Sequence, residues 1–434
     1  MKWTKTAAAV SLVALAAAGC SSDSGGNDSP DGSGGGDVVV IRYISSTILE
    51  SPEKDFEQKV IDEFNAQDNG VKVEVEGVAA NDLMNKYTAF ATANQMPDFY
   101  MADMKNTTQL VDMGLAEDVR DVFDSDYLDS FTDGALAGMT IDGVPSGIPW
   151  FSTPQGIVYR TDLFEAAGVE VPTTWDELVT AAKQLTGNDK YGITLVGTKD
   201  GSGAGRFQYV LRNFGVDEFT QDSSGEWQTD IGSDDYAKAL KAYTDLDTVD
   251  GVVPPGVTET DYATAVNLLS SGQAAMLITG SNAIGAITSR VPDLKGSLGS
   301  FPIPAVKRAV TSQSGFGFFV SPTSEHKDAV AKFLQFIVSD EKAIEFSQMT
   351  GRLPTLTAAA QSPEIGQDPA LSGFLQSLTD ADVVFTLPTI EGYGEVNDIH
   401  GEAYQSVFTG SATPEQAAEV ARQRAQALAD EANG

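Results

Sequence analysis

Short apolar runs and amphipathic stretches alternate over most of the chain. Residues 38–43 (VVVIRY) form a continuous β-prone run, which is typical of a buried strand. Residues 71–75 (VKVEV) alternate apolar and polar side chains, which predicts a half-buried strand. Between these two runs, apolar side chains recur at helical spacing, so a helix is expected there, ending at the Asn69-Gly70 turn.

The same succession continues toward the middle of the chain. Residues 81–93 and 107–113 are predicted helices, and residues 96–101 (MPDFYM) are a predicted strand between them. Strand, helix, strand, helix, strand at this spacing is typical of an α/β unit with a largely parallel sheet.

A second series of predicted elements begins after residue 160. Thr174 and Glu177 are three residues apart, which predicts a capping box at the start of a helix. Residues 191–196 (YGITLV) and 273–278 (QAAMLI) are predicted strands. Residues 199–205 are rich in glycine, so a loop is expected there. These elements predict a second α/β unit.

A turn and two adjacent aromatic residues separate the two series. The Asp142-Gly143 turn is followed by Pro149, Trp150 and Phe151, and then by a β-prone run. We therefore expect the chain to pass here from one compact unit to the other. The two aromatic side chains would then face a ligand between the units, or they pack in a core beneath a loop.

Length and composition indicate the number of domains, and the charge excludes one class of partner. The 434 residues are too many for one ordinary core, so two domains are expected, and 41% hydrophobic residues suffice to fill them. The 27 basic and 62 acidic residues give a formal net charge of −35. Because phosphate backbones need basic surfaces, nucleic acid is excluded as a partner.

The N-terminal residues carry the pattern of an export signal. Lys2 and Lys5 precede an apolar run of small residues at 7–18, which is too short to remain as a membrane-spanning helix. Cys20, the single cysteine, follows directly. The segment resembles a bacterial lipoprotein signal, which implies cleavage of residues 1–19 and acylation of the Cys20 sulfur. Residues 21–37 contain only Ser, Gly, Asp, Asn and Pro, so residues 20–37 are expected to form a lipid-bearing flexible linker.

The sequence contains no clear catalytic motif of the kinds considered below. His326 and His400 lack partners at metal-ligand spacing, and the sequence holds no G-x-S-x-G motif. Acidic residues are so abundant that they do not identify a glycosidase pair. Neither a metal nor a cofactor is therefore expected. Two functions stay open at this point: a secreted, lipid-anchored glycoside hydrolase, and a sensory or structural binding lipoprotein.

Several short motifs follow one another in the order found in a known family. They are residues 97–98 (PD), 147–150 (GIPW), 158–159 (VY), 174–178 (TWDEL), 272–276 (GQAAM), 315–317 (GFG) and 351–354 (GRLP). From residue 38 to the C-terminus, the chain resembles the extracellular solute-binding proteins of the carbohydrate-uptake class of ABC importers, the class that includes maltose-binding protein.

This resemblance implies a two-lobed α/β fold, each lobe a mostly parallel sheet flanked by helices. Lobe one would hold residues 38–146 and 280–318, and lobe two residues 147–279 and 319–434, with crossovers near residues 146–149, 278–280 and 317–322. A sugar would lie in the cleft between the lobes, and hinge closure would present it to a membrane permease. We expect the chain to act as a monomer on the extracellular face of the cell membrane.

The resemblance also implies a set of ligand contacts. Sugars present apolar C–H faces and a rim of hydroxyl groups, so aromatic rings, carboxylates, amides and guanidinium groups suit them. The expected ligand-binding residues are Thr47, Asp103, Lys105, Trp150, Asn282, Phe316, Arg352 and Tyr393. Other roles stay open for some of them: Phe316 and Tyr393 as core residues, and Asp103 as a helix cap.

Overall fold

The computed structural model describes residues 38–312, 314–385, 388 and 390–434. The predicted signal peptide and Cys20, the predicted acylation site, lie outside the described residues. Within the described part, no helix combines the length and the apolar character that crossing a membrane would require.

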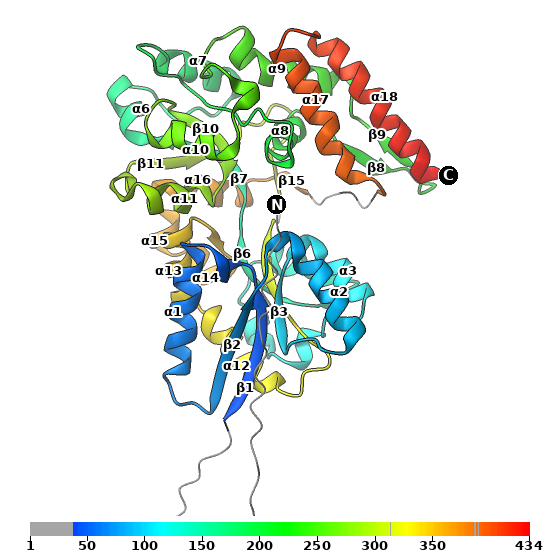
Figure 1. Ribbon diagram of the computed structural model, residues 1–434. Helices are drawn as coiled ribbons and strands as arrows, with labels where there is room; N and C mark the ends of the chain where they lie inside the picture. Colours follow the sequence, from blue (N-terminus) through cyan, green and yellow to red (C-terminus); the bar gives the residue numbers. More distant parts are fainter. Residues whose placement is uncertain (1–37, 313, 386–387, 389) are drawn as a thin grey trace, which may run out of the picture. The chain divides into compact units, whose positions relative to one another are not determined.

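A six-stranded sheet forms the centre of the first lobe, with the order β14-β6-β13-β3-β1-β2 (Figure 1). Its strands are β1 (Val39–Ser45), β2 (Val71–Gly77), β3 (Phe99–Asp103), β6 (Ile148–Ser152), β13 (Gly315–Val320) and β14 (Leu353–Pro354). β1 runs parallel to β2 and β3, whereas β13 runs antiparallel to both of its neighbours.

Helices cover both faces of this sheet, because side chains alternate along its strands. Met101 of β3 packs in one cluster with α1 (Glu53–Asn65), α12 (Lys327–Ile337) and α13 (Asp340–Thr350). Tyr100 and Ala102, pointing the other way, pack with α2 (Leu83–Ala93) and α3 (Thr107–Asp112). Figure 1 shows α1 on one side of the strands and α2 and α3 on the other.

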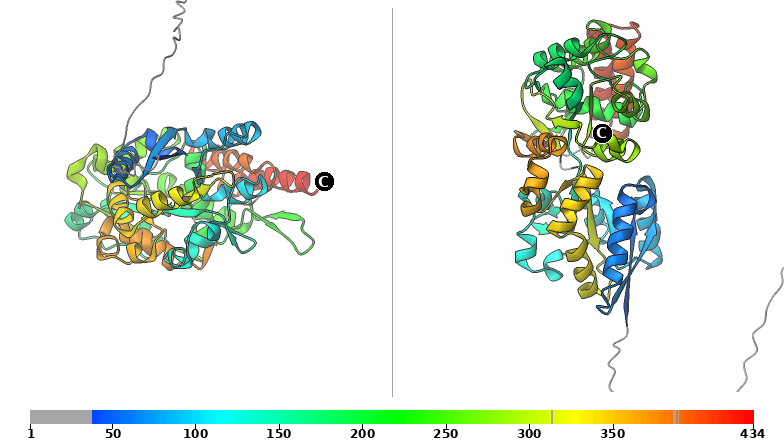
Figure 2. Two further views of the ribbon diagram at one scale, coloured as in Figure 1. Left: turned by 90° about the horizontal axis from the view of Figure 1, so that it is seen from below. Right: turned by 90° about the vertical axis from the view of Figure 1, so that its left-hand side faces the viewer.

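The second lobe is built around a smaller sheet of order β10-β7-β11. β7 (Gln155–Arg160) lies between β10 (Met276–Gly280) and β11 (Leu298–Phe301) and is antiparallel to both. The expectation of a mostly parallel sheet in each lobe is therefore wrong for this sheet, and the first sheet is mixed because β13 and β14 pair antiparallel with their neighbours. In place of the strand predicted at 191–196, this segment makes two isolated parallel bridges, from Tyr191 to Ala274 just before β10 and from Thr194 to Leu277 of β10. The surrounding helices are α6 (Thr161–Ala167), α7 (Trp175–Leu185), α8 (Gly201–Asn213), α9 (Asp234–Thr248), α10 (Tyr262–Ser270), α11 (Ala283–Arg290), α16 (Pro369–Thr379), α17 (Val396–Phe408) and α18 (Pro414–Asn433). Figure 2 shows α17 and α18 side by side.

Short elements complete the chain. The helices are α4 (Ser125–Leu128), α5 (Asp133–Ala137), α14 (Thr357–Ala360) and α15 (Pro363–Gly366). The strands are β4 (Thr140–Ile141), β5 (Val144–Pro145), β8 (Phe219–Gln221), β9 (Trp227–Thr229), β12 (Val310–Ser312) and β15 (Val383–Phe385), which pair as β4-β5, β8-β9 and β12-β15.

Local predictions succeed where a side chain determines the backbone. The capping box is confirmed, since the Thr174 hydroxyl accepts a hydrogen bond from the Glu177 amide and the Glu177 carboxylate accepts one from the Thr174 amide.

The loop predicted at 199–205 is wrong from Gly201 onward, where α8 begins. The Asp200 carboxylate accepts two amides of the first turn, and the apolar face of α8 is buried in the second core.

The division into lobes differs from the one expected. β6 belongs to the six-stranded sheet, α12 and α13 pack in its core, and α11 and β11 pack with the second lobe. The chain therefore passes between the sheets at Thr153-Pro154, within 302–314 and after β14. The sequence pattern shows where strands occur but not which distant strand each of them pairs with. The predicted lobe boundaries therefore differ from the observed ones.

Candidate functional site

A cavity of about 600 Å³ is lined by residues of both lobes. The first lobe contributes the end of β3 and the turn after it, together with residues of α5 and β4. The second lobe contributes one face of α8, with Gln155 of β7 and Phe385 of β15 beside it. The polar and aromatic residues of the lining are Asp103, Lys105, Thr107, Thr108, Thr140, Gln155, Ser202, Arg206, Gln208, Tyr209, Arg212, Ser312, Ser314 and Phe385.

Helical periodicity divides α8 between the core and the cavity. Phe207, Val210 and Leu211 are fully buried in the second core. Arg206 and Tyr209, three residues apart, line the cavity and are only partly buried. The apolar face of α8 therefore fixes the positions of a guanidinium group and an aromatic ring at the cavity wall.

Arg206 is held by neighbours that carry no charge. Its NH1 group donates to the backbone carbonyl and the hydroxyl of Ser202, both at 2.7 Å, and its NH2 group lies 3.4 Å from the Thr279 hydroxyl. The guanidinium carbon lies 4.4 Å from the centre of the Tyr262 ring. Burial lowers the pKa of Arg206 below its ordinary value.

Arg212 lies on α8, six residues after Arg206. A buried carboxylate holds its side chain. Arg212 pairs with Glu218 and lies over the Phe385 ring, 3.2 Å from its centre. Glu218 also accepts hydrogen bonds from His400 Nε2 at 2.6 Å and from the Tyr393 hydroxyl at 2.7 Å. Burial acts to raise the pKa of Glu218, but the Arg212 charge and these hydrogen bonds outweigh it and lower the pKa to about 2.

The first-lobe wall carries a paired carboxylate at the end of β3. Asp103 accepts the Lys105 backbone amide at 3.1 Å, and the Lys105 ammonium lies 3.0 Å from the second carboxylate oxygen. The structure thus brings the predicted residues Asp103 and Lys105 into the cavity lining, where Asp103 is at the same time a cap for the turn after it.

Trp150 and Thr47 lie elsewhere. Trp150 is 2% exposed and stacks against Phe318 and Phe346, with ring centres 4.9 and 5.0 Å away, so it is a core residue of the first lobe. Thr47 is buried, and its hydroxyl donates to the Glu57 carboxylate at 2.7 Å. Neither residue lines the cavity.

Phe316 and Tyr393 also have structural neighbours. Phe316 pairs with Asp103 in the sheet, and its ring lies 5.7 Å from that of Phe151. Tyr393 supports Arg212 from behind, through the carboxylate of Glu218 that both contact. Phe316 packs against the first core and Tyr393 against the second, which fits the alternative role of both as core residues.

Arg352 and Asn282 lie near the crossing between β6 and β7. Arg352 pairs with Glu53 at 2.7 Å and lies over the Phe151 ring, 4.8 Å from its centre. Burial lowers its pKa. Asn282 directly precedes α11, and its side-chain oxygen lies close to Gly280. Neither side chain is part of the cavity lining.

The residues that α8 contributes, Arg206, Tyr209 and Arg212, are not among those predicted from the sequence. The glycines that precede them predict a loop and not a helix. Two signals in the sequence indicate the helix: an N-cap residue, Asp200, and apolar residues at helical spacing from Phe207 onward.

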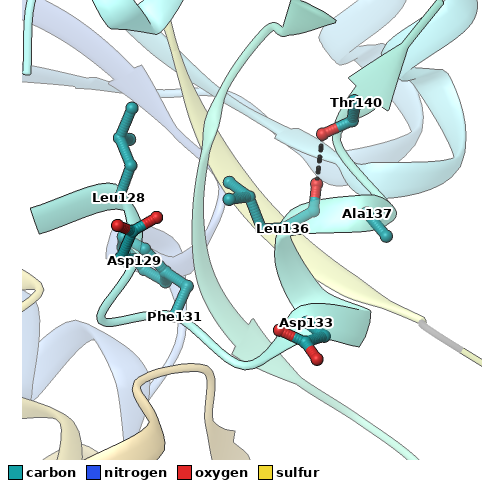
Figure 3. Close-up of a pocket in the computed structure, with 7 residues that line it drawn as sticks. All are labelled: Leu128, Asp129, Phe131, Asp133, Leu136, Ala137 and Thr140. Atoms are coloured by element: carbon teal, nitrogen blue, oxygen red, sulfur yellow. Dashed lines mark hydrogen bonds between the residues drawn. The ribbon is translucent and has the colours of Figure 1, made fainter. Parts of the chain in front are cut away.

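A second hollow lies in the first lobe, beside α4 and α5 (Figure 3). Of the described residues, its lining contains the carboxylates of Asp129 and Asp133 and no basic residue. The Thr140 hydroxyl is turned to the Leu136 carbonyl at 2.8 Å, and Phe131 is buried. This hollow offers fewer groups for a polar ligand. Across the described ranges, no group of His, Cys, Asp and Glu side chains could hold a metal ion.

The sequence matches the profile of the bacterial extracellular solute-binding proteins over residues 50–344. The chain belongs to this family. A binding protein of Brucella abortus is 26% identical over 368 residues, which cover 84% of this chain and 87% of that protein. The mannitol-binding protein of Pseudomonas aeruginosa is 24% identical over 324 residues, covering 69% and 73%. The predicted family is thus confirmed.

Solved structures confirm the predicted fold class. The maltose-bound MalE3 of T. maritima superposes with a TM-score of 0.71 at 24% identity, covering 90% of this chain and all of that one. The Thermus thermophilus maltotriose-binding protein gives a TM-score of 0.70 at 22% identity, covering 91% and 100%. The family and the fold together confirm an extracellular solute-binding protein with two α/β lobes.

Proposed function

We propose that this protein captures a sugar or oligosaccharide outside the cell and delivers it to the membrane permease of an ABC importer. The observation that carries this proposal is the cavity of about 600 Å³ formed by residues of both lobes, a volume in the range of small-molecule sites. Relatives named for mannitol and maltotriose support a polyhydroxylated ligand.

The lining has the chemistry that a sugar requires. The ring of Tyr209 offers an apolar face for stacking on C–H groups. The Asp103 carboxylate and the Gln155 amide offer acceptors and donors for hydroxyl groups. A ligand that contacts both walls favours the arrangement in which both sets of contacts form, so binding and closure of the lobes are linked. No chemical step is needed for this role.

Lipid attachment is a further part of the proposal. Signal peptidase would remove residues 1–19, and the acylated Cys20 would hold a monomer on the outer face of the membrane, with residues 21–37 as a tether. Mass spectrometry of the N-terminal peptide from purified membranes tests this: a diacylated Cys20 supports it. Release of the Cys20→Ala variant into the medium would also support lipid attachment through Cys20. An unmodified Cys20 in the wild-type protein would contradict lipid attachment.

A thermal-shift screen tests the transport role directly. Monosaccharides, oligosaccharides and polyols are added to the purified protein, and a ligand at 100 times its Kd should stabilise the fold by roughly 2.7 kcal/mol. Hits are confirmed by calorimetry, and chromatography of the recovered sugar checks that it is unchanged. The proposal fails when no sugar or polyol raises the melting temperature, or when the bound sugar is hydrolysed.

A further inference from the structure

Basic groups outnumber acidic groups in the cavity lining of a strongly acidic chain. Among the described residues of the lining, the charged ones are Asp103, Lys105, Arg206 and Arg212. Three of these four are basic, although the whole chain has 27 basic and 62 acidic residues. The cavity is therefore a local exception to the net charge of −35.

Pairing accounts for two of the three positive charges. Lys105 pairs with Asp103 at 3.0 Å, so the first-lobe wall is locally neutral. Arg212 pairs with Glu218, which is fully buried beside it. Each of these cations thus has its own carboxylate.

Arg206 has no such partner among the described residues. Its polar contacts are with Ser202 and Thr279, which are uncharged. Its Nε atom, like that of Arg212, is buried and makes no hydrogen bond within the described part of the chain. Asp200, six residues earlier, lies close enough for its charge to act against the lowering of the Arg206 pKa. Its carboxylate accepts the Ser202 and Gly203 amides and the Thr198 hydroxyl and forms no ion pair with Arg206 among the described residues.

A ligand in the cavity would cover Arg206 and remove more of its hydration. Hydroxyl groups of a neutral sugar accept hydrogen bonds but leave the positive charge uncompensated, and burying an unpaired charge is costly. A carboxylate on the ligand both accepts the hydrogen bonds and balances the charge, and its planar shape suits a guanidinium group.

We propose that the ligand is an acidic saccharide of the uronate type, whose carboxylate pairs with Arg206. This inference rests on the proposed sugar-binding function and specifies the class of sugar. Tyr209 would stack on the sugar ring, since it lies one turn further along the same face of α8.

Calorimetric titration of the purified protein with matched sugars tests this assignment. Each pair has the same ring and length and differs only in the acid group: glucose with glucuronate, galactose with galacturonate, and their oligomers. A uronate should bind at least tenfold more tightly than its neutral partner. The preference should weaken as the salt concentration rises, because the added contact is an ion pair.

Substitution of Arg206 separates this contact from the rest of the site. Arg206→Gln should reduce the preference for the uronate to within about twofold, while Arg206→Lys should retain part of it. Arg120→Gln is the matched control, because Arg120 pairs with Asp118 on the exposed surface of the first lobe. The wild-type comparison of the paired sugars needs no variant, so the test stands even where a substitution impairs folding.

The outcomes separate the two proposals. Equal or tighter binding of the neutral sugars overturns the assignment of an acidic ligand and leaves the sugar-binding function in place. Binding of uronates that is unaffected by Arg206→Gln overturns the role of Arg206. Absence of binding by either class, or binding of inorganic phosphate alone, overturns the inference together with the proposed function.

Discussion

The presence of an aromatic residue in the sequence does not show whether its side chain faces a ligand or packs in a core. Trp150 and Phe151 are large, adjacent and preceded by a turn, which is a pattern that suits a ligand contact. Both are buried in the first core. Tyr209, which has no conspicuous sequence context, lines the cavity.

Removal of the Trp150 ring should therefore affect stability rather than binding. Trp150→Ala leaves a cavity between Phe318 and Phe346, and the free energy of unfolding should fall by about 3–5 kcal/mol. Urea unfolding measures this, and calorimetry at low temperature should give a ligand Kd within about twofold of wild type. Unchanged stability with a tenfold weaker Kd would show that Trp150 contacts the ligand instead.

Removal of the Tyr209 ring should have the opposite effect. Tyr209→Ala should weaken sugar binding by about 1–3 kcal/mol, because a partly buried stacking surface is lost. Tyr209→Phe keeps the ring and loses only the hydroxyl that contacts Ser312, so its Kd should stay near the wild-type value. Equal affinity of the alanine variant in calorimetry would rule out a stacking role.

At the scale of elements, α8 positions the cavity wall, and a buried network fixes α8. Glu218 joins Arg212 of α8 to His400 of α17, and His400 in turn contacts the hydroxyl of Tyr236 on α9. The network lies behind the cavity, so it holds the Arg212 side chain in place without contacting a ligand.

Loss of the Glu218 charge should destabilise the second lobe in a pH-dependent way. Glu218→Gln leaves the buried Arg212 guanidinium without a carboxylate, so the free energy of unfolding at pH 7 should fall by about 3–5 kcal/mol. The pKa of Glu218 is lowered from 4.5 to about 2 in the folded protein. Its stabilising effect is therefore complete above pH 4.5 and is lost as the pH falls toward 2.

Urea unfolding at several pH values checks this prediction. The gap between wild type and Glu218→Gln should be constant from pH 7 to pH 5 and should narrow below pH 4.5. Asp217→Asn is the control, since this neighbouring carboxylate pairs with Arg308 near the surface and should contribute less than about 1 kcal/mol. A gap that persists at pH 2.5 would contradict the assignment of this charge.

The sequence predicts elements better than it predicts their partners. The Thr174 capping box is readable because both partners lie within one turn. α8 is hidden by its three glycines, whose low helix propensity is overridden by the Asp200 cap and by burial of the apolar face. The pairing of β13 with β3 and β6 joins residues far apart in the chain, and no local pattern specifies it.

The same limit applies to the candidate site. Asp103 and Lys105 were found because they directly follow a recognisable strand. Arg206 and Tyr209 reach the cavity only through the orientation of α8 against the second core, which depends on contacts with α9 and α17. Such contacts are set by tertiary packing and not by local sequence.

At the scale of the whole molecule, the function depends on the coupling of two separately built lobes. Each lobe has its own sheet, and β6 continues directly into β7 through Thr153 and Pro154 (Figure 1). Segments that cross between two compact units with so few residues can act as hinges. The cavity lining draws on both units, so occupancy should change their relative position.

Small-angle X-ray scattering can detect this change. Addition of a saturating sugar should decrease the radius of gyration, because the ligand favours the arrangement in which both walls contact it. The Tyr209→Ala variant at the same sugar concentration should show a smaller decrease, and a sugar that gives no thermal shift should show none. An unchanged radius of gyration at saturation would show that binding and closure are not linked.

We expect the solute to lie against α8, in the cavity that both lobes line. A crystal structure of the protein with the sugar identified by the thermal-shift screen tests it most directly. We expect density for the sugar ring beside Tyr209, with its polar groups within hydrogen-bond distance of Asp103 and Arg206. Density in the hollow of Figure 3, beside Asp129 and Asp133, or at any place away from α8, would contradict it.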